Sequence, residues 1–386
     1  MKRALLALLL CGCTERTQLI PAADGGSCNG SATPVRLGAT CAATLAADSM
    51  RQAICVCDSL VLAGNLTTDA PSPPPPMPGQ PPRPPSAGVA TNGSLQVGGL
   101  VQIAGDAIAA STSGMSFSRT ASILGSLRSD GSVAATQLVT VGDDAFVGGD
   151  VLGRVDVGGM LHVSPASNLG PMVSADGVVH EAVTVDAPCG CDTPVVDAAA
   201  LAAAAAHAND DAAIALAPDA LAHAAAPTLD LPCGQYYLSS LSASGPVALR
   251  VHGKSALFVG GDVTLAAGMQ VALDDDAELD LVVAGNLDAE GGGLAGDPAP
   301  SLRVWLGGAT LRVGSGAVLS AAVYAPAATL VAAGALDVTG AIFVGSVSAG
   351  DDVTARFDPA LLDGGNECGD PAATPSSVSP PAALPD

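Results

Sequence analysis

The chain has 386 residues, carries a net charge of −23 and contains only 2% aromatic residues. An excess of carboxylates of this size disfavours nucleic acids and anionic membrane surfaces as partners. The scarcity of aromatic and basic side chains also disfavours the sugar-binding grooves of polysaccharide-cleaving enzymes.

The first twelve residues follow the order of a bacterial signal peptide. Met1-Lys2-Arg3 is positively charged, residues 4–10 are apolar, and Leu10-Cys11-Gly12-Cys13 follows. These four residues resemble a lipobox, which implies cleavage after residue 12 and attachment of acyl chains, palmitate among them, to Cys13. Cys11 is the rival site. The apolar run is much shorter than the ~20 residues that span a membrane.

We therefore expect a lipid-anchored protein of the cell envelope, with the lipid membrane as a partner through the acyl chains of Cys13. Thr14, in place of an aspartate, favours the outer membrane. A secretory signal without lipid and an uncleaved helix are the alternatives. After cleavage, 12 basic residues remain against 37 acidic ones, a net charge of −25.

Eight further cysteines remain, an even number that favours disulfides outside the cytoplasm. Proximity along the chain predicts one set of pairs within residues 28–57 and a second group around residues 189–233. A zinc site using His207 and three of these cysteines (189, 191 and 233) is an alternative that the Cys-x-Cys spacing disfavours. The eight are Cys28, Cys41, Cys55, Cys57, Cys189, Cys191, Cys233 and Cys368.

Composition divides the remaining chain. Residues 13–69 are expected to form a small cysteine-containing head. Residues 70–90 are rich in proline and predict a polyproline II linker that spaces the head from the rest, with an SH3-type ligand as the alternative. Residues 364–386, rich in Gly, Pro and Ser, are expected to be a disordered tail.

Short Val, Leu and Ile runs alternate with Gly and Asp in residues 91–188 and again in 234–363, a pattern typical of short strands and tight corners. The hexapeptide at 146–151, Phe-Val-Gly-Gly-Asp-Val, recurs at 258–263 and in degenerate form at 343–347. Later strand centres step by 24, 21, 19 and 20 residues, which predicts the coils of an all-β, parallel β-solenoid. These centres are Val259, Val283, Val304, Val323 and Phe343.

Residues 189–233 interrupt this pattern with an Ala-rich stretch. Thr193 as N-cap and Pro194 in the first turn predict a helix over 194–208, and a shorter helix is expected from Asp219 to Ala225. We expect this helical insertion to cover one end of the coils, held by the cysteines at 189, 191 and 233.

Residues 233–362 resemble a bacterial domain family of unknown function, seen in surface lipoproteins and pilus-assembly-like proteins. The resemblance implies a right-handed parallel β-solenoid (β-helix) and no established catalytic residue. Phe357 stands where relatives usually have Tyr, and the head is loosely similar to myxobacterial lipoproteins. The segments that carry the resemblance are residues 233–238, 256–263, 278–281, 284–287, Tyr324-Ala325-Pro326, 340–344 and Arg356-Phe357-Asp358.

The densest acidic run is a candidate Ca²⁺ site, formed by Asp274, Asp275, Asp276 and Glu278. The glycine-rich nonapeptide of calcium-binding solenoids is missing from the sequence, so a solvated turn is the favoured interpretation. The same interpretation applies to Asp143-Asp144 and Asp351-Asp352. We expect no metal and no cofactor.

The modular order predicts a membrane anchor at one end and a rigid acidic rod at the other. We expect a structural or adhesive envelope lipoprotein, not an enzyme, with polysaccharide or other envelope proteins as partners and no nucleic acid. A carbohydrate-active β-helix lyase or hydrolase is the alternative, and a self-assembling envelope scaffold is a further one.

Overall fold

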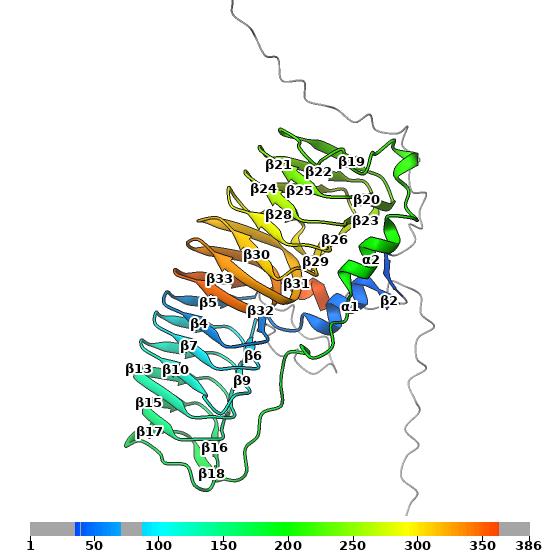
Figure 1. The fold of residues 1–386 in the computed structure, drawn as a ribbon. Coiled ribbons are helices and arrows are strands. Elements are labelled where there is room, and N and C mark those ends of the chain that lie inside the picture. Colours follow the sequence, from blue (N-terminus) through cyan, green and yellow to red (C-terminus); the bar gives the residue numbers. More distant parts are fainter. Residues whose placement is uncertain (1–34, 39, 71–86, 363–386) are drawn as a thin grey trace, which may run out of the picture.

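The computed structural model describes residues 35–38, 40–70 and 87–362. Thirty-one strands form one continuous sheet, wound into a parallel β-solenoid of about 13 coils (Figure 1). Each coil has three faces, since strands β6, β7 and β8 lie in register on β3, β4 and β5 of the coil before. The predicted solenoid is therefore confirmed.

The strands form because apolar and polar residues alternate over three-residue runs. In β7 (Leu95–Val97), the two apolar residues are buried and Gln96 between them is exposed. The apolar side chains of successive coils stack into one narrow, mostly aliphatic core. Registers in the later coils differ slightly from the expected ones: Val283 lies beside Leu306, and Val323 beside Ile342.

The coils form two stacks. The N-terminal stack comprises β3 (Ile54–Val56), β4 (Leu60–Leu62), β5 (Leu66–Asp69), β6 (Val89–Thr91), β7, β8 (Val101–Ile103), β9 (Ala107–Ala109), β10 (Met115–Phe117), β11 (Ala121–Ile123), β12 (Leu127–Ser129), β13 (Val133–Val141), β14 (Ala145–Val147), β15 (Val151–Val157), β16 (Met160–Val163), β17 (Met172–Ser174) and β18 (Gly177–His180).

The C-terminal stack comprises β19 (Thr228–Leu231), β20 (Gly234–Leu238), β21 (Leu241–Ala243), β22 (Val247–Val251), β23 (Lys254–Val259), β24 (Val263–Leu265), β25 (Met269–Leu273), β26 (Glu278–Val283), β27 (Leu287–Ala289), β28 (Leu294–Asp297), β29 (Leu302–Leu306), β30 (Thr310–Val313), β31 (Ala317–Ala332), β32 (Leu336–Ala349) and β33 (Val353–Arg356). Outside the coils lie β1 (Arg36–Leu37), β2 (Thr40–Cys41), α1 (Ala42–Ser49), α2 (Ala198–Ala205) and the 3₁₀ turns η1 (Asp211–Ala213), η2 (Ala299–Ser301) and η3 (Pro359–Leu362).

The chain enters the rod in its middle, and not at an end. The N-terminal stack starts at β3 and runs to one end at β18, after which the chain returns along the rod and starts the C-terminal stack at the other end (Figure 1). That stack then descends until β32 and β33 pair with β3, β4 and β5. We call this pairing the joint, and residues 181–197 the return segment.

The joint changes the expected domain order. Residues 54–69, expected to belong to a separate head, are one coil of the solenoid, because their backbone pairs with β32 and β33 on one side and with the next coil on the other. The proline-rich segment therefore connects β5 to β6 within the rod and does not space a head from it. Residues 71–86 themselves lie outside the described part of the chain.

Main-chain and corner contacts both hold the joint. Ile54 lies in register between Ile342 and Val89, and all three are buried. At the corner, the Asn65 backbone N–H and side-chain amide both donate to the Asp352 carboxylate, at 2.8 and 3.0 Å. Gly64 is required there, since a Cβ would lie 2.5 Å from the backbone of residue 351.

The helices differ from those expected over 194–208 and 219–225. Helix α2 begins later because the Asp197 carboxylate accepts the Ala200 N–H at 2.9 Å, while the Val195 N–H donates to the rod. No second helix forms over 219–225. The backbone there pairs with β21, where Ala224 forms a parallel bridge with Ala243.

Residues 206–227 cover the end of the C-terminal stack, as expected of the insertion. They bury Ile214, Leu216 and Leu221 against the first coil of that stack, which contains β19 and β20. The Asp210 and Asp211 carboxylates accept the N–H groups of residues 235 and 237 in β20, at 2.8 and 2.9 Å. This cap therefore satisfies backbone donors that an open end would leave unpaired.

One prediction concerns Asp211 in this cap. Burial raises the pKa of Asp211, the N–H of Tyr237 partly opposes this, and the Asp210 charge adds to it. Compared with the unfolded chain, the folded state therefore favours the neutral form of Asp211. The folding stability that this preference adds is lost as the pH rises through the folded pKa. We expect Asp211→Asn, which keeps an acceptor oxygen, to raise the thermal unfolding midpoint at pH 7.

The advantage of Asp211→Asn should shrink below the ordinary Asp pKa of about 4, where the wild-type carboxyl is also neutral. Asp219→Asn, at an exposed position of the same cap, is the matched control and should change little at either pH. A lower midpoint for Asp211→Asn at pH 7 would contradict the expectation.

Candidate functional site

A single row of outward-facing side chains runs the length of the rod, one per coil. It contains six of the chain's nine aromatic residues, so it is a packing surface and not a solvated face. We call it the outer row. Its members, from one end to the other, are Val179, His162, Phe146, Arg128, Ile108, Ala90, Cys55, Phe343, Tyr324, Trp305, Val282, Phe258 and Tyr237.

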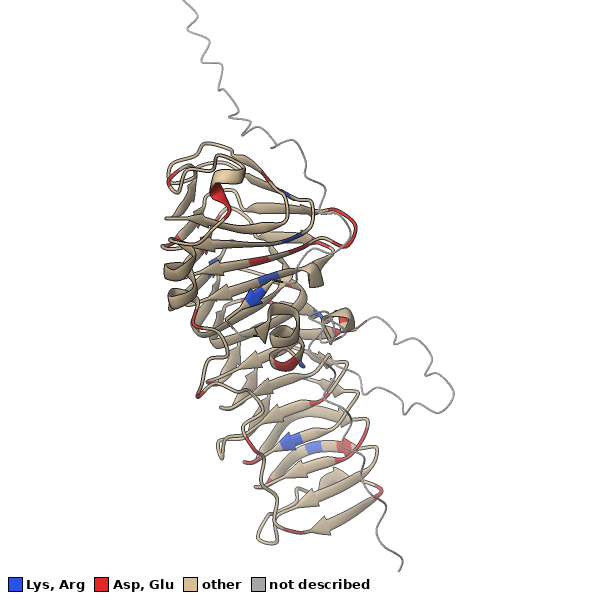
Figure 2. Ribbon diagram, turned by 90° about the vertical axis from the view of Figure 1, so that its right-hand side faces the viewer, with Lys and Arg blue, Asp and Glu red and all other residues tan. Residues whose placement is uncertain are grey.

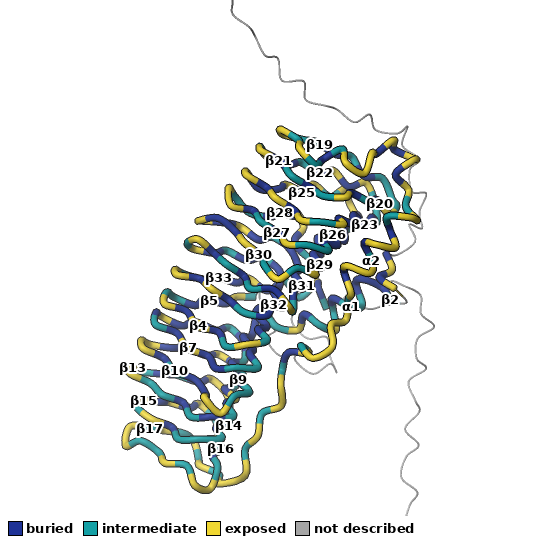
Figure 3. Tube along the Cα trace, viewed as in Figure 1, coloured by how far each residue is buried: buried dark blue, intermediate teal, exposed yellow. Residues whose placement is uncertain are grey.

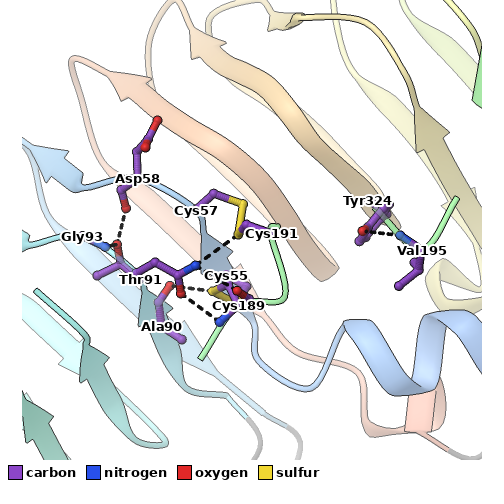
Figure 4. Close-up of a disulfide and its surroundings, with 11 residues drawn as sticks. Cys55, Cys57, Asp58, Ala90, Thr91, Gly93, Cys189, Cys191, Val195 and Tyr324 are labelled. Carbon is purple, nitrogen blue, oxygen red and sulfur yellow. Dashed lines mark hydrogen bonds between the residues drawn. A yellow bond between two sulfur atoms is a disulfide. The ribbon is translucent and has the colours of Figure 1, made fainter. Parts of the chain in front are cut away.

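The return segment lies over this row and is tied to it at intervals. Glu181 bonds His162 at 2.7 Å, and the Val185 N–H donates to Asp130 at 3.3 Å. Further along, the Val195 N–H donates to the Tyr324 hydroxyl at 3.0 Å (Figure 4). Burial raises the pKa of Tyr324, so its hydroxyl stays neutral.

Two adjacent disulfides hold the return segment to the joint coil: Cys55–Cys189 and Cys57–Cys191 (Figure 4). The Asn92 side chain supports the first disulfide by donating to the carbonyl of residue 189 at 2.8 Å and accepting its N–H at 3.0 Å. Each disulfide closes a separation of 134 residues.

The predicted local pairing of these four cysteines is wrong. Among these four, the cysteines close in sequence do not pair with each other, because each bonds to a residue that comes near it only in the folded rod. The missed signal was the matched spacing of two Cys-x-Cys pairs, since residues two apart in an extended strand face the same side.

The structure describes only some of the other cysteines. Cys41 and Cys233 are also disulfide-bonded, while Cys13, Cys28 and Cys368 lie outside the described residues. The zinc alternative with His207 is overturned, because Cys189 and Cys191 are oxidised and have no thiolate to offer a metal.

A buried ion cluster lies beside the aromatic part of the outer row. Asp280 is fully buried and accepts two hydrogen bonds from Arg303, at 2.8 and 2.9 Å, and one from the Trp305 indole at 2.8 Å. Glu278 bonds the same guanidinium and Lys254, the latter at 2.9 Å. The sequence analysis did not identify Asp280, Arg303 or Trp305 as a cluster. The one signal was Arg303, a basic residue in coils that contain few Lys or Arg.

The cluster is suited to structure and not to proton transfer. Burial alone would lower the pKa of Arg303, but the charges and hydrogen bonds of Asp280 and Glu278 outweigh it and raise the pKa above its usual value. The guanidinium therefore stays charged at every accessible pH. Helix α2 covers the neighbouring strands β20, β23 and β26, and approaches closely where Gly307 leaves room for Ala198.

The candidate calcium ligands do not converge. Asp274 bonds His252 at 2.8 Å, Asp275 and Asp276 are exposed, and Glu278 belongs to the ion cluster. Within the described ranges, no group of three or more His, Cys, Asp or Glu side chains is arranged to hold a metal ion.

Carboxylates at other corners have a role that the sequence did not suggest. Asp144 accepts the Met160 N–H at 2.7 Å and Asp352 accepts the Asn65 N–H, so each bonds the backbone of the next coil. They are not merely solvated turns, as was expected of them. Such bonds to ionised acceptors contribute more than neutral ones.

Two cavities border the seam between the helices, the return segment and the rod. The first, about 330 Å³, lies between residues 181–188 and the outer row at Arg128 and Phe146. The Phe146 ring stacks on His162 at 4.5 Å and lies 4.8 Å from the Arg128 guanidinium. Both faces of this ring are therefore occupied, and neither is free to stack on a sugar.

The second cavity, about 600 Å³, is lined by charged and amide side chains, among them Arg36, Asn209, Asp210, Gln235 and Lys254. The described lining of neither cavity includes a histidine beside a nucleophile. In the described residues, the geometry is that of a packing interface between the return segment and the outer row, held by two disulfides.

Comparison with known proteins finds a family match for one part of the chain. Residues 181–363 match a family described as "Domain of unknown function (DUF7305)", so such a domain is present. No curated protein and no solved structure matches the chain significantly. None of the helices in the described ranges is long and apolar enough to cross a membrane. The matched region begins with the return segment, whose anchoring cysteines bond to the N-terminal stack.

The disulfides give a second prediction. Replacing Cys55, Cys57, Cys189 and Cys191 together by Ala leaves no free thiol from these two disulfides. It should lower the free energy of unfolding by about 2–4 kcal/mol, because a long closed loop is released. Replacing only one pair should cost much less, because the other disulfide still closes almost the same loop. Removing both disulfides should also expose the return segment to cleavage by Asp-N protease at Asp186 and Asp192.

Mapping without reductant checks that disulfides link the joint coil to the return segment. Trypsin should release fragments 52–119 and 155–250 linked by disulfides, since Arg51, Arg119, Arg154 and Arg250 bound them. Fragments that separate without reductant would contradict the pairing.

The ion cluster gives a third prediction. Asp280→Ala should cost about 3–5 kcal/mol in guanidinium unfolding, because Arg303 would be left buried with only part of its compensation. Asp337→Ala removes the partner of Arg356 in a half-exposed pair and is the matched control, worth about 0–1 kcal/mol. Equal losses in the two variants would show that the buried pair adds nothing of its own.

Proposed function

We propose that the chain is a structural or adhesive lipoprotein of the cell envelope, anchored through acyl chains on Cys13. The observation that carries the proposal is the place where the chain enters the rod. Helix α1 and strand β3 lie at the joint, so an N-terminal tether attaches to the middle of the rod (Figure 1).

The length of the tether sets the geometry. Twenty-one residues, 14–34, separate the lipidation site from the first described residue. An extended chain of this length spans at most about 75 Å. A rod tethered there lies alongside the membrane or stands off it with both ends free, in place of the end-on arrangement that the sequence suggested.

The surface supports binding more than catalysis. Many acidic residues lie in the turns between strands, and basic residues are few (Figure 2). Such a surface repels anionic lipid and keeps the rod soluble while it presents its sides to partners. Polysaccharide or other envelope proteins are the partners we propose, and the outer membrane is the location. The carbohydrate-active alternative gains no support from the seam, where the Phe146 ring is covered on both faces.

Cys13→Ala tests the anchor. We expect the wild-type chain to incorporate labelled palmitate and to sediment with membranes, and Cys13→Ala to lose both, because two or more acyl chains are needed for stable anchoring. Cys11→Ala is the matched control and should keep both properties. Unchanged fractionation of Cys13→Ala, or insensitivity of processing to globomycin, would rule out the lipid anchor.

Protease added to intact cells then tests exposure. A surface-presented rod should be cleaved by the added protease while an internal periplasmic marker stays intact. Protection of the rod in intact cells, with cleavage only after the outer membrane is opened, would place it on the periplasmic side.

A further inference from the structure

The two ends of the rod are closed differently. The β19 end is covered by the cap at residues 206–227, which buries Ile214, Leu216 and Leu221. At the β18 end, β17 and β18 pair only with β15 and β16, and no described residue covers their outer edge. The last coil therefore presents an open strand edge.

The core itself is open at this end. Val178 lies in register with Leu161 and shares its inward position, yet Val178 is 44% exposed while Leu161 is fully buried. Leu169 and Val173, also at inward positions, are only partly covered, and Met172 beside them is 59% exposed. Figure 3 shows β17 at this end in the colours of intermediate and exposed residues. Exposed apolar side chains combined with unpaired strand edges are the features that drive strand association.

The charge of the last coil also favours contact. Residues 164–180 contain one acidic residue, Asp176, and no Lys or Arg, in a chain of 37 acidic residues. Two copies that repel each other along their sides can approach through this coil with little charge to desolvate.

The rod already contains one contact of this kind. At the joint, the last coil of the C-terminal stack pairs in parallel with the first coil of the N-terminal stack, which shows that exposed coil edges of this chain can pair end to end within one rod. The cap prevents the same docking at the β19 end. A head-to-tail filament is therefore blocked, and the arrangement left is a closed pair related by a two-fold axis.

We propose that the coil formed by β17 and β18 docks against the same coil of a second copy, giving an end-to-end dimer of rods. The two-fold axis makes the facing strands antiparallel and covers Val178 and Met172 of both copies. The dimer does not depend on lipidation of Cys13. Where the chain is anchored, it would carry two tethers on one rod of double length.

Analytical ultracentrifugation tests the proposal on the chain from Thr14 onward, exported with a signal peptide that adds no lipid. We expect a concentration-dependent dimer with the frictional ratio of a longer rod. Val178→Asp should raise the dissociation constant about tenfold or more, since symmetry places two carboxylates in one apolar contact. Val318→Asp, at a valine 43% exposed on the side of β31, is the matched control and should leave the dimer intact.

A second variant guards against local unfolding of the last coil. Met172→Lys changes an outward side chain at the rim and should also weaken the dimer, with an unchanged circular dichroism spectrum. A monomer at all concentrations, a dimer indifferent to both variants, or growth beyond two copies would overturn the proposal. A monomer that dimerises only after deletion of residues 364–386 would overturn it too, because the chain's own tail would then be the cover.

Discussion

The rod depends on one interaction, the main-chain pairing of β3 with β32 at the joint. This pairing joins residues almost 290 positions apart in sequence and merges two coil stacks into one core. A parallel coil gains most of its stability from the coil above and below it, so each stack would have an open apolar end without the other. The corner bonds of Asp352 and the buried Ile54 reinforce this contact, and the disulfides tie the return segment to the same coil.

The return segment follows from that topology. Because the N-terminal stack ends at one tip and the C-terminal stack begins at the other, the chain has to travel along the rod. The outer row supplies the surface on which it lies, which explains why most of the few aromatic residues are concentrated there. Beside the outer row, the buried ion pair of Asp280 and Arg303 adds a polar contact to this packing, because Asp280 also accepts a hydrogen bond from the Trp305 indole.

The proposed function rests on where the chain enters the rod and on what the two ends of the rod expose. Entry of the chain at the joint leaves both tips distant from the tether, one covered and one open. The return segment covers the outer row. We therefore expect contacts with other molecules to form on the acidic sides of the rod and at its open end. These properties are the basis on which we propose a structural or binding role.

The sequence by itself determined the repeating unit. Alternation of apolar and polar residues, glycine at corners and steps near 20 residues define a stacked parallel coil, because those signals are local and repeated. The hydrogen bond from Val195 to Tyr324 and the cysteine pairs depended on neighbours far along the chain. Only the tertiary structure decided that residues 54–69 belong to the rod, that Cys55 pairs with Cys189, and that the rod is entered from its middle. Coil edges offer nearly the same backbone pairing everywhere, so local sequence cannot say which two edges meet.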